Sequence, residues 1–184
     1  MKSKTFNWAV RIVAIVVLAI GTGALAQAPS PVHYVGILSD YTPLSPSAKP
    51  TGPWEMRGEW TLDLQGASGK ADFSAVMAME LSDYWVLTTN ADPTNAAVRG
   101  AHTHNITIAD AMVTPIAGGF EVSGPVAVTA NGSPAPFSAS PSTLTVDITG
   151  GTSVGASNVT LTFSGAATGH FGSHAIHGVV RNFE

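Results

Sequence analysis

The pattern that decides the fold lies in residues 56–64, which read MRGEWTLDL. Apolar side chains or glycine occupy every second position, namely Met56, Gly58, Trp60, Leu62 and Leu64. Charged and polar side chains occupy the positions between them. A period of two residues is typical of a β-strand with one buried and one solvated face. Residues 56–64 therefore predict a half-buried strand.

The same alternation continues along the chain. A turn at residues 66–69 leads into a second apolar face from Ala71 to Leu81, so the two segments predict a β-hairpin. Further strands are expected at residues 84–88, 102–108, 112–116, 120–129, 144–148, 159–163 and 176–183, with a tight turn at Ala109-Asp110. No long helical period interrupts them. We therefore expect residues 54–184 to form one all-β antiparallel domain of about 8–10 strands. Consecutive hairpins favour a closed β-barrel, and a two-sheet β-sandwich is the alternative.

The first 26 residues have the pattern of a cleaved signal peptide. Basic residues precede the strongly apolar segment 12–20, and Ala24-Leu25-Ala26 has the small-x-small form of a cleavage site. An uncleaved membrane anchor is the alternative. We expect a secreted or periplasmic protein that keeps no stable membrane anchor after cleavage.

Residues 27–53 contain half of the twelve prolines of the chain. Because proline removes a backbone donor and disfavours helices, we expect an extended arm, with a linker as the alternative. Val32 to Leu38 are compatible with one edge strand inside this segment.

Composition excludes several kinds of site. Cleavage after Ala26 would remove three of the eight basic residues and none of the twelve acidic ones, so the net charge would change from −4 to −7. Such a chain offers no basic patch for nucleic acid. It contains no cysteine, which excludes disulfides, thiolate metal sites and a cysteine nucleophile. The sequence leaves the oligomeric state open.

Histidines are the candidate metal ligands. His102 and His104 share one face of a predicted strand with Ile106 and Ile108, which directs both imidazoles inward. A third ligand is expected from residues 169–178, where strand parity favours His174 and then His170. Such a group would suit a divalent transition metal such as zinc or copper. The alternative is that these histidines only form structural hydrogen bonds.

Large side chains on the inward faces suggest a second kind of site. Trp60, Phe73, Met77, Tyr84 and Trp85 are the candidate ligand-binding residues, because such side chains can line a pocket as well as fill a core. By contrast, Glu55, Glu59 and Asp63 are expected on the solvated outer face of the first strand.

Three functions follow from these patterns. The first is an exported β-barrel that binds a small apolar or amphipathic ligand. The second is an enzyme that uses the histidine cluster, with or without a metal. The third is a structural or interaction module. The sequence leaves open whether the protein is an enzyme.

Overall fold

The computed structural model describes residues 32–42, 53–66, 69–82, 99–135, 137, 140–150 and 157–183. The elements, in chain order, are β1 (Val32–Tyr41), β2 (Trp54–Leu64), β3 (Lys70–Leu81), β4 (His102–Ile116), β5 (Gly119–Pro125), β6 (Ala127–Ala130), β7 (Ser133–Pro134), β8 (Ser142–Thr149), β9 (Asn158–Gly165), the short helix α3 (Thr168–Phe171) and β10 (Ile176–Phe183). The prediction of an all-β antiparallel domain is confirmed.

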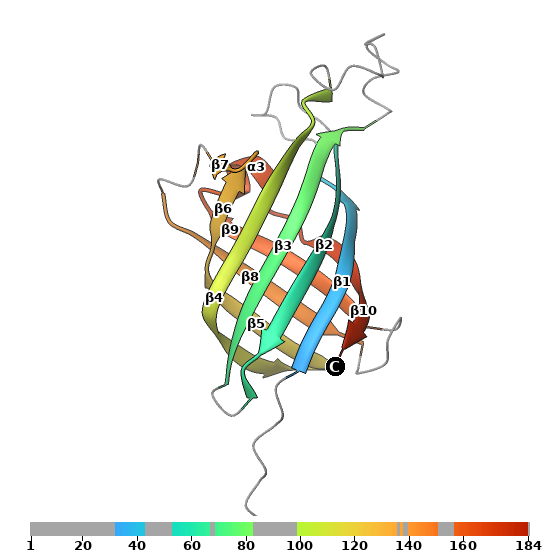
Figure 1. The fold of residues 1–184 in the computed structure, drawn as a ribbon, viewed down its shortest axis with the longest axis vertical. Helices are drawn as coiled ribbons and strands as arrows, with labels where there is room; N and C mark the ends of the chain where they lie inside the picture. Colours follow the sequence, from blue (N-terminus) through green and yellow to red (C-terminus); the bar gives the residue numbers. More distant parts are fainter. Residues whose placement is uncertain are drawn as a thin grey trace, which may run out of the picture.

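Eight of these strands close into a barrel (Figure 1). Around the barrel they follow the order β1-β2-β3-β4-β5-β8-β9-β10, and β10 pairs again with β1. The pairing of β3 with β4 closes the sheet, so the barrel is confirmed over the sandwich. β1 lies between β2 and β10, which makes it an interior strand of the closed sheet instead of an edge strand.

β4 is one strand of 15 residues, so the predicted tight turn at Ala109-Asp110 is wrong. A shift of register against β3 occurs there, and Asp110 has a positive φ of 53°. This is the geometry of a β-bulge. The Oδ1 atom of Asp72 accepts a hydrogen bond from the Asp110 backbone N–H at 2.7 Å, and Lys70 forms an ion pair with the Asp110 carboxylate at 2.9 Å. Residues 109 and 110 therefore form a bulge within one strand and not the turn that the sequence predicted.

The wall of the barrel divides beyond Pro125. β5 pairs with β4 on one side and with β8 on the other. β6 keeps its pairing with β4, and its other pairing is with β7 instead of β8. Proline has no backbone N–H to donate, which fits the end of β5 at Pro125. We call this end of the barrel, where β4 begins and where α3 lies near β6 and β7, the open end (Figure 1).

The apolar core fills the barrel. It includes Trp60 and Phe73, whose rings stack at 6.2 Å between centroids. The alternating residues of β8 and β9 complete it with Leu144, Val146, Ile148, Val159, Leu161 and Phe163. Gly36 has a packing role here, because a Cβ at this position would lie 2.5 Å from the Trp60 ring. The inward faces predicted from alternation are therefore the buried faces.

Some predictions fall outside the described residues. These are the signal peptide at residues 1–26, most of the proline-rich arm and the strand expected at residues 84–88. Within the described part of the chain, no helix has the length and the apolar character needed to span a membrane.

Candidate metal centre

β4 carries the first two histidines at its first and third residues. Both side chains point inward, since His104 is only 1% exposed and His102 is half-buried. Their rings are in edge contact at 4.7 Å between centroids. The pleat of one strand therefore places two imidazoles on the same inward face, as the alternation predicted.

Helix α3 supplies the third histidine. Phe171 is buried and stacks on Phe163 of β9 with centroids 4.2 Å apart, which anchors the helix against the barrel. His170 precedes this anchor and packs on the His104 ring at 4.8 Å. The short helix therefore holds a half-buried imidazole over the inward ends of the first two.

The Nε2 atoms of the three rings converge. The distance between the Nε2 atoms of His104 and His170 is 2.9 Å, and that between the Nε2 atoms of His102 and His170 is 3.3 Å. Within the described residues, these three form a group able to hold a metal ion, with ligand atoms within 4.8 Å of one another. Nitrogens at about 2.0–2.1 Å from a tetrahedral zinc ion lie about 3.3 Å apart. The two distances to the Nε2 atom of His170 are thus close to those between the ligands of a metal site. We call His102, His104 and His170 the histidine triad.

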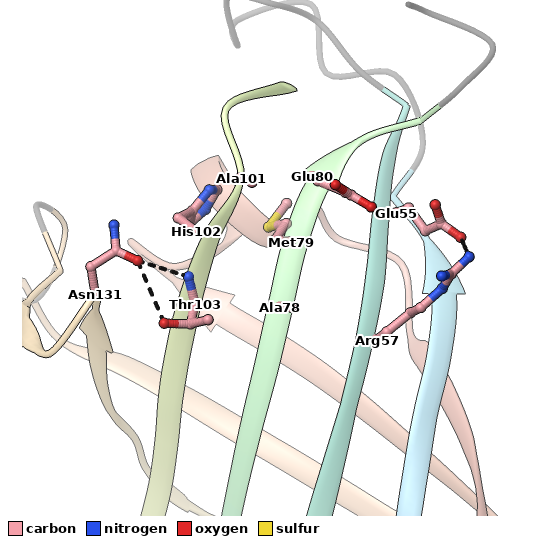
Figure 2. Close-up of a pocket in the computed structure, with 9 residues that line it drawn as sticks. All are labelled: Glu55, Arg57, Ala78, Met79, Glu80, Ala101, His102, Thr103 and Asn131. Carbon is pink, nitrogen blue, oxygen red and sulfur yellow. Dashed lines mark hydrogen bonds and ion pairs between the residues drawn. The ribbon is translucent and has the colours of Figure 1, made fainter. Parts of the chain in front are cut away.

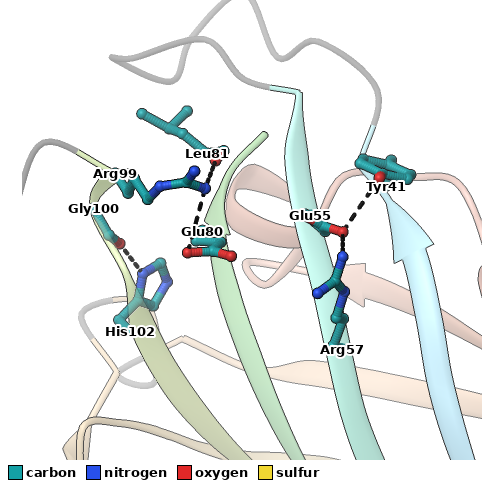
Figure 3. Close-up of polar contacts among 8 residues, drawn as sticks. All are labelled: Tyr41, Glu55, Arg57, Glu80, Leu81, Arg99, Gly100 and His102. Carbon is teal, nitrogen blue, oxygen red and sulfur yellow. Dashed lines mark hydrogen bonds and ion pairs between the residues drawn. The ribbon is translucent and has the colours of Figure 1, made fainter. Parts of the chain in front are cut away.

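Backbone carbonyls orient two of the rings. The Nδ1 atom of His102 lies 2.6 Å from the carbonyl oxygen of Gly100 (Figure 3). The Nδ1 atom of His104 lies 2.9 Å from the carbonyl oxygen of Thr129. A carbonyl oxygen only accepts hydrogen bonds, so each Nδ1 carries the proton and donates it. Each Nε2 atom of these two rings is then unprotonated and can act as a hydrogen-bond acceptor or a metal ligand. This arrangement is typical of histidines that bind metals.

The environment keeps two of the rings neutral. Burial lowers the pKa of His104 to about 4, helped by the nearby His102 and opposed by the hydrogen bond to Thr129. Burial, together with the two other rings of the triad, also lowers the pKa of His170 to about 4. Neutral imidazole is the form that binds metals, so neither ring must lose a proton at pH 7 to act as a ligand.

A cavity of about 520 Å³ opens beside the triad. All three histidines line it, together with Ala130, Asn131, Phe137, Ala166 and Gly169. None of these residues carries a formal charge when the imidazoles are neutral. The Phe137 ring stacks on His170 with centroids 5.4 Å apart. The cavity beside the triad is therefore lined by uncharged and partly apolar residues.

Charged residues lie on the neighbouring side of the open end. A groove of about 340 Å³ there is lined by His102, Asn131, Glu55, Arg57 and Glu80, among others (Figure 2). Glu55 was expected to be solvated but is buried. Its ion pair with Arg57 and the hydrogen bond that it accepts from Tyr41 offset the cost of burying its carboxylate (Figure 3). Glu80 forms an ion pair with Arg99 at 3.6 Å. His102 thus lies between an uncharged cavity and a charged groove.

The other candidate residues lie elsewhere. His174 is exposed and lies outside the triad, because β10 begins only at Ile176 and strand parity does not extend back to position 174. His170 joins the triad from a helix, so its parity with His174 is not what places it there. Among the predicted ligand-binding residues, Trp60, Phe73 and Met77 are at most 1% exposed and belong to the core, whereas Tyr84 and Trp85 lie outside the described residues.

Comparison of the chain with protein-family models, with curated proteins and with solved structures gave no match.

Proposed function

We propose that this protein is an exported β-barrel that binds a transition-metal ion through His102, His104 and His170 and presents that ion to a small ligand. Export rests on the signal-peptide pattern of residues 1–26. The metal site rests on one observation, the convergence of three Nε2 atoms with two of the rings locked by backbone carbonyls.

Hydrogen bonding alone accounts poorly for this arrangement. With Nδ1 protonated, His102 and His104 both offer only an acceptor at Nε2. His170 has one Nε2 position, which can donate a single proton between the two acceptors at 3.3 and 2.9 Å. One neighbouring lone pair is then left without a full donor from the triad. A cation at the centre would satisfy all three nitrogens.

The donor set favours zinc or copper. Imidazole nitrogen suits these ions, whereas magnesium and calcium prefer oxygen ligands. The triad contains no carboxylate, and the chain has no cysteine. Three protein ligands also leave at least one coordination position for water or an exogenous ligand.

The cavity supports a role for that free position. Its uncharged lining beside Phe137 and Ala166 favours a small neutral molecule with an apolar body and one atom able to coordinate the metal. A ligand that binds and leaves would make the protein a carrier or sensor. A ligand that reacts on the metal would make it an enzyme.

Metal binding by protein purified without a histidine tag tests the proposal. We expect about one equivalent of zinc or copper per chain, and an affinity at least about 100-fold lower in His104→Gln, because a ligand is lost. His174→Gln is the matched control, since that exposed histidine lies outside the triad and its loss should leave the affinity unchanged. Less than about a tenth of an equivalent bound after incubation with either metal would contradict the proposal.

A further inference from the structure

Methionines adjoin the histidine triad across the sheet. Met79 of β3 is the cross-strand partner of His102, and Met77 is the partner of His104. Met56 of β2 is in turn the partner of Met79. All three methionines are at most 1% exposed. The inward face at the open end thus combines thioether and imidazole side chains.

Met79 is singled out among these thioethers because it lines the same groove as His102. Directly opposed residues of antiparallel strands have Cβ atoms about 4.5–5.5 Å apart. The flexible side chain of methionine has three rotatable bonds and can adjust its sulfur over several ångströms. Figure 2 shows the sulfur of Met79 on the side of β3 that faces His102. The Met56 side chain lies one strand further from the triad.

Met79 and the cavity lie on different sides of β4. β3 pairs with one edge of β4, and β6 pairs with the other edge at residues 104–107. The cavity beside the triad is lined by residues 130 and 131 at the end of β6 and by residues 166, 169 and 170 in and next to α3. A thioether that reaches the triad from β3 would therefore leave the cavity unblocked.

We propose that Met79 supplies a thioether ligand to the metal held by the triad and that the site consequently prefers copper, above all Cu(I), to zinc. Thioether sulfur is a soft, uncharged ligand that binds Cu(I) well and adds little to zinc affinity. Neutral ligands alone also suit the single positive charge of Cu(I). This inference rests on the proposed metal site, since it names the ion that the site selects.

The test compares two metals in matched variants. Metal-free protein without a tag is titrated with Cu(I) under anaerobic conditions against a chromophoric Cu(I) chelator, and separately with Zn²⁺ against a zinc indicator. In Met79→Leu we expect a roughly tenfold loss of Cu(I) affinity and an unchanged zinc affinity. Met56→Leu removes an equally buried thioether one strand further away and should change neither affinity.

X-ray absorption of the Cu(I)-loaded wild-type protein gives a direct measurement that needs no variant. We expect one sulfur neighbour beside the nitrogen neighbours, and its absence in Met79→Leu. A spectrum with nitrogen neighbours only, or equal losses of Cu(I) and zinc affinity in Met79→Leu, would overturn the inference. In either case the proposed function stands if His104→Gln still loses metal. A wild-type protein that binds neither metal would overturn both.

Discussion

The two ends of the barrel differ in what fills the inward face of the same two strands. Away from the open end, Phe73 of β3 pairs with Ile108 of β4, and both are buried in the apolar core. Toward the open end, Met77 and Met79 pair with His104 and His102. The pleat and the pairing are the same along this part of β4. The strands beyond β4 differ. β5 pairs with β8 and continues the barrel wall, whereas β6 pairs with β7.

This contrast shows how a filled barrel can still carry a polar site. Where the wall is continuous, the inward side chains contact one another and exclude water. Where β6 parts from β8, α3 covers the interior with one apolar and one polar side chain, Phe171 and His170. A buried imidazole is tolerated only where partners satisfy it, and here the partners are backbone carbonyls and other imidazoles. The divided wall thus accommodates the histidine triad and the cavity beside it.

The largest expected effect lies in the continuous part of the barrel. Phe73→Ala should lower the free energy of unfolding by about 3–5 kcal/mol, because it leaves a cavity where the ring stacked on Trp60. Phe137→Ala at the open end should cost less, since that ring is only half-buried. Urea denaturation of both variants measures the difference. Equal losses would show that the two ends are packed alike.

The next prediction concerns how the free energy of unfolding depends on pH through the histidines of the open end. In the metal-free protein, His104 and His170 have pKa values of about 4, whereas an unfolded histidine titrates near about 6.5. Between about pH 4 and about pH 6.5, these two histidines are protonated in the unfolded chain and neutral in the folded chain. The free energy of unfolding should therefore fall as the pH is lowered from about 7 to about 4.

Urea midpoints across this pH range, in the presence of a chelator, measure that fall. The double variant His104→Gln/His170→Gln lacks both groups and should show a shallower dependence. If the double variant shows the same pH dependence as the wild type, groups other than His104 and His170 cause the fall in the free energy of unfolding. The open end would then not differ from the rest of the barrel in its response to pH.

The smallest effect on stability concerns the anchor of α3. Phe171→Leu should cost about 0.5–1.5 kcal/mol through loss of the ring stacking on Phe163. It should also lower metal affinity roughly tenfold, because His170 is then held less firmly over the other rings. Ile148→Val is the control, since it costs a similar amount in the continuous part of the core and should leave metal affinity intact. Parallel losses of affinity in both variants would contradict a specific anchoring role.

Much of the fold was predictable from local alternation. The inward faces of β2, β3, β8 and β9 followed directly from apolar residues at every second position, as at Trp60 and Leu144. The Ala109-Asp110 pair misled the prediction, because a residue with positive φ serves a turn and a bulge equally well. Only the partner strand β3, with Asp72 and Lys70 beside Asp110, distinguishes the two.

The candidate site was predictable only in part. The inward direction of His102 and His104 follows from their spacing on one strand. The preference for His174 over His170 assumed that the last strand extends back through residue 174. That assumption is wrong, because β10 begins at Ile176 and His170 lies in a helix. A signal was present in Gly172, which lies between the two histidines, because a glycine inside a predicted strand weakens that prediction.

The amino-acid sequence by itself determined the all-β class, the inward faces of the strands and the presence of imidazoles on one of them, because alternation is a local property of the chain. The tertiary structure decided which distant segments meet. It selected His170 as the third member of the triad, placed the carbonyl oxygen of Thr129 at the Nδ1 atom of His104 and divided the wall beside β6. These features depend on strand register and closure, which arise from contacts between residues as far apart as 102 and 170.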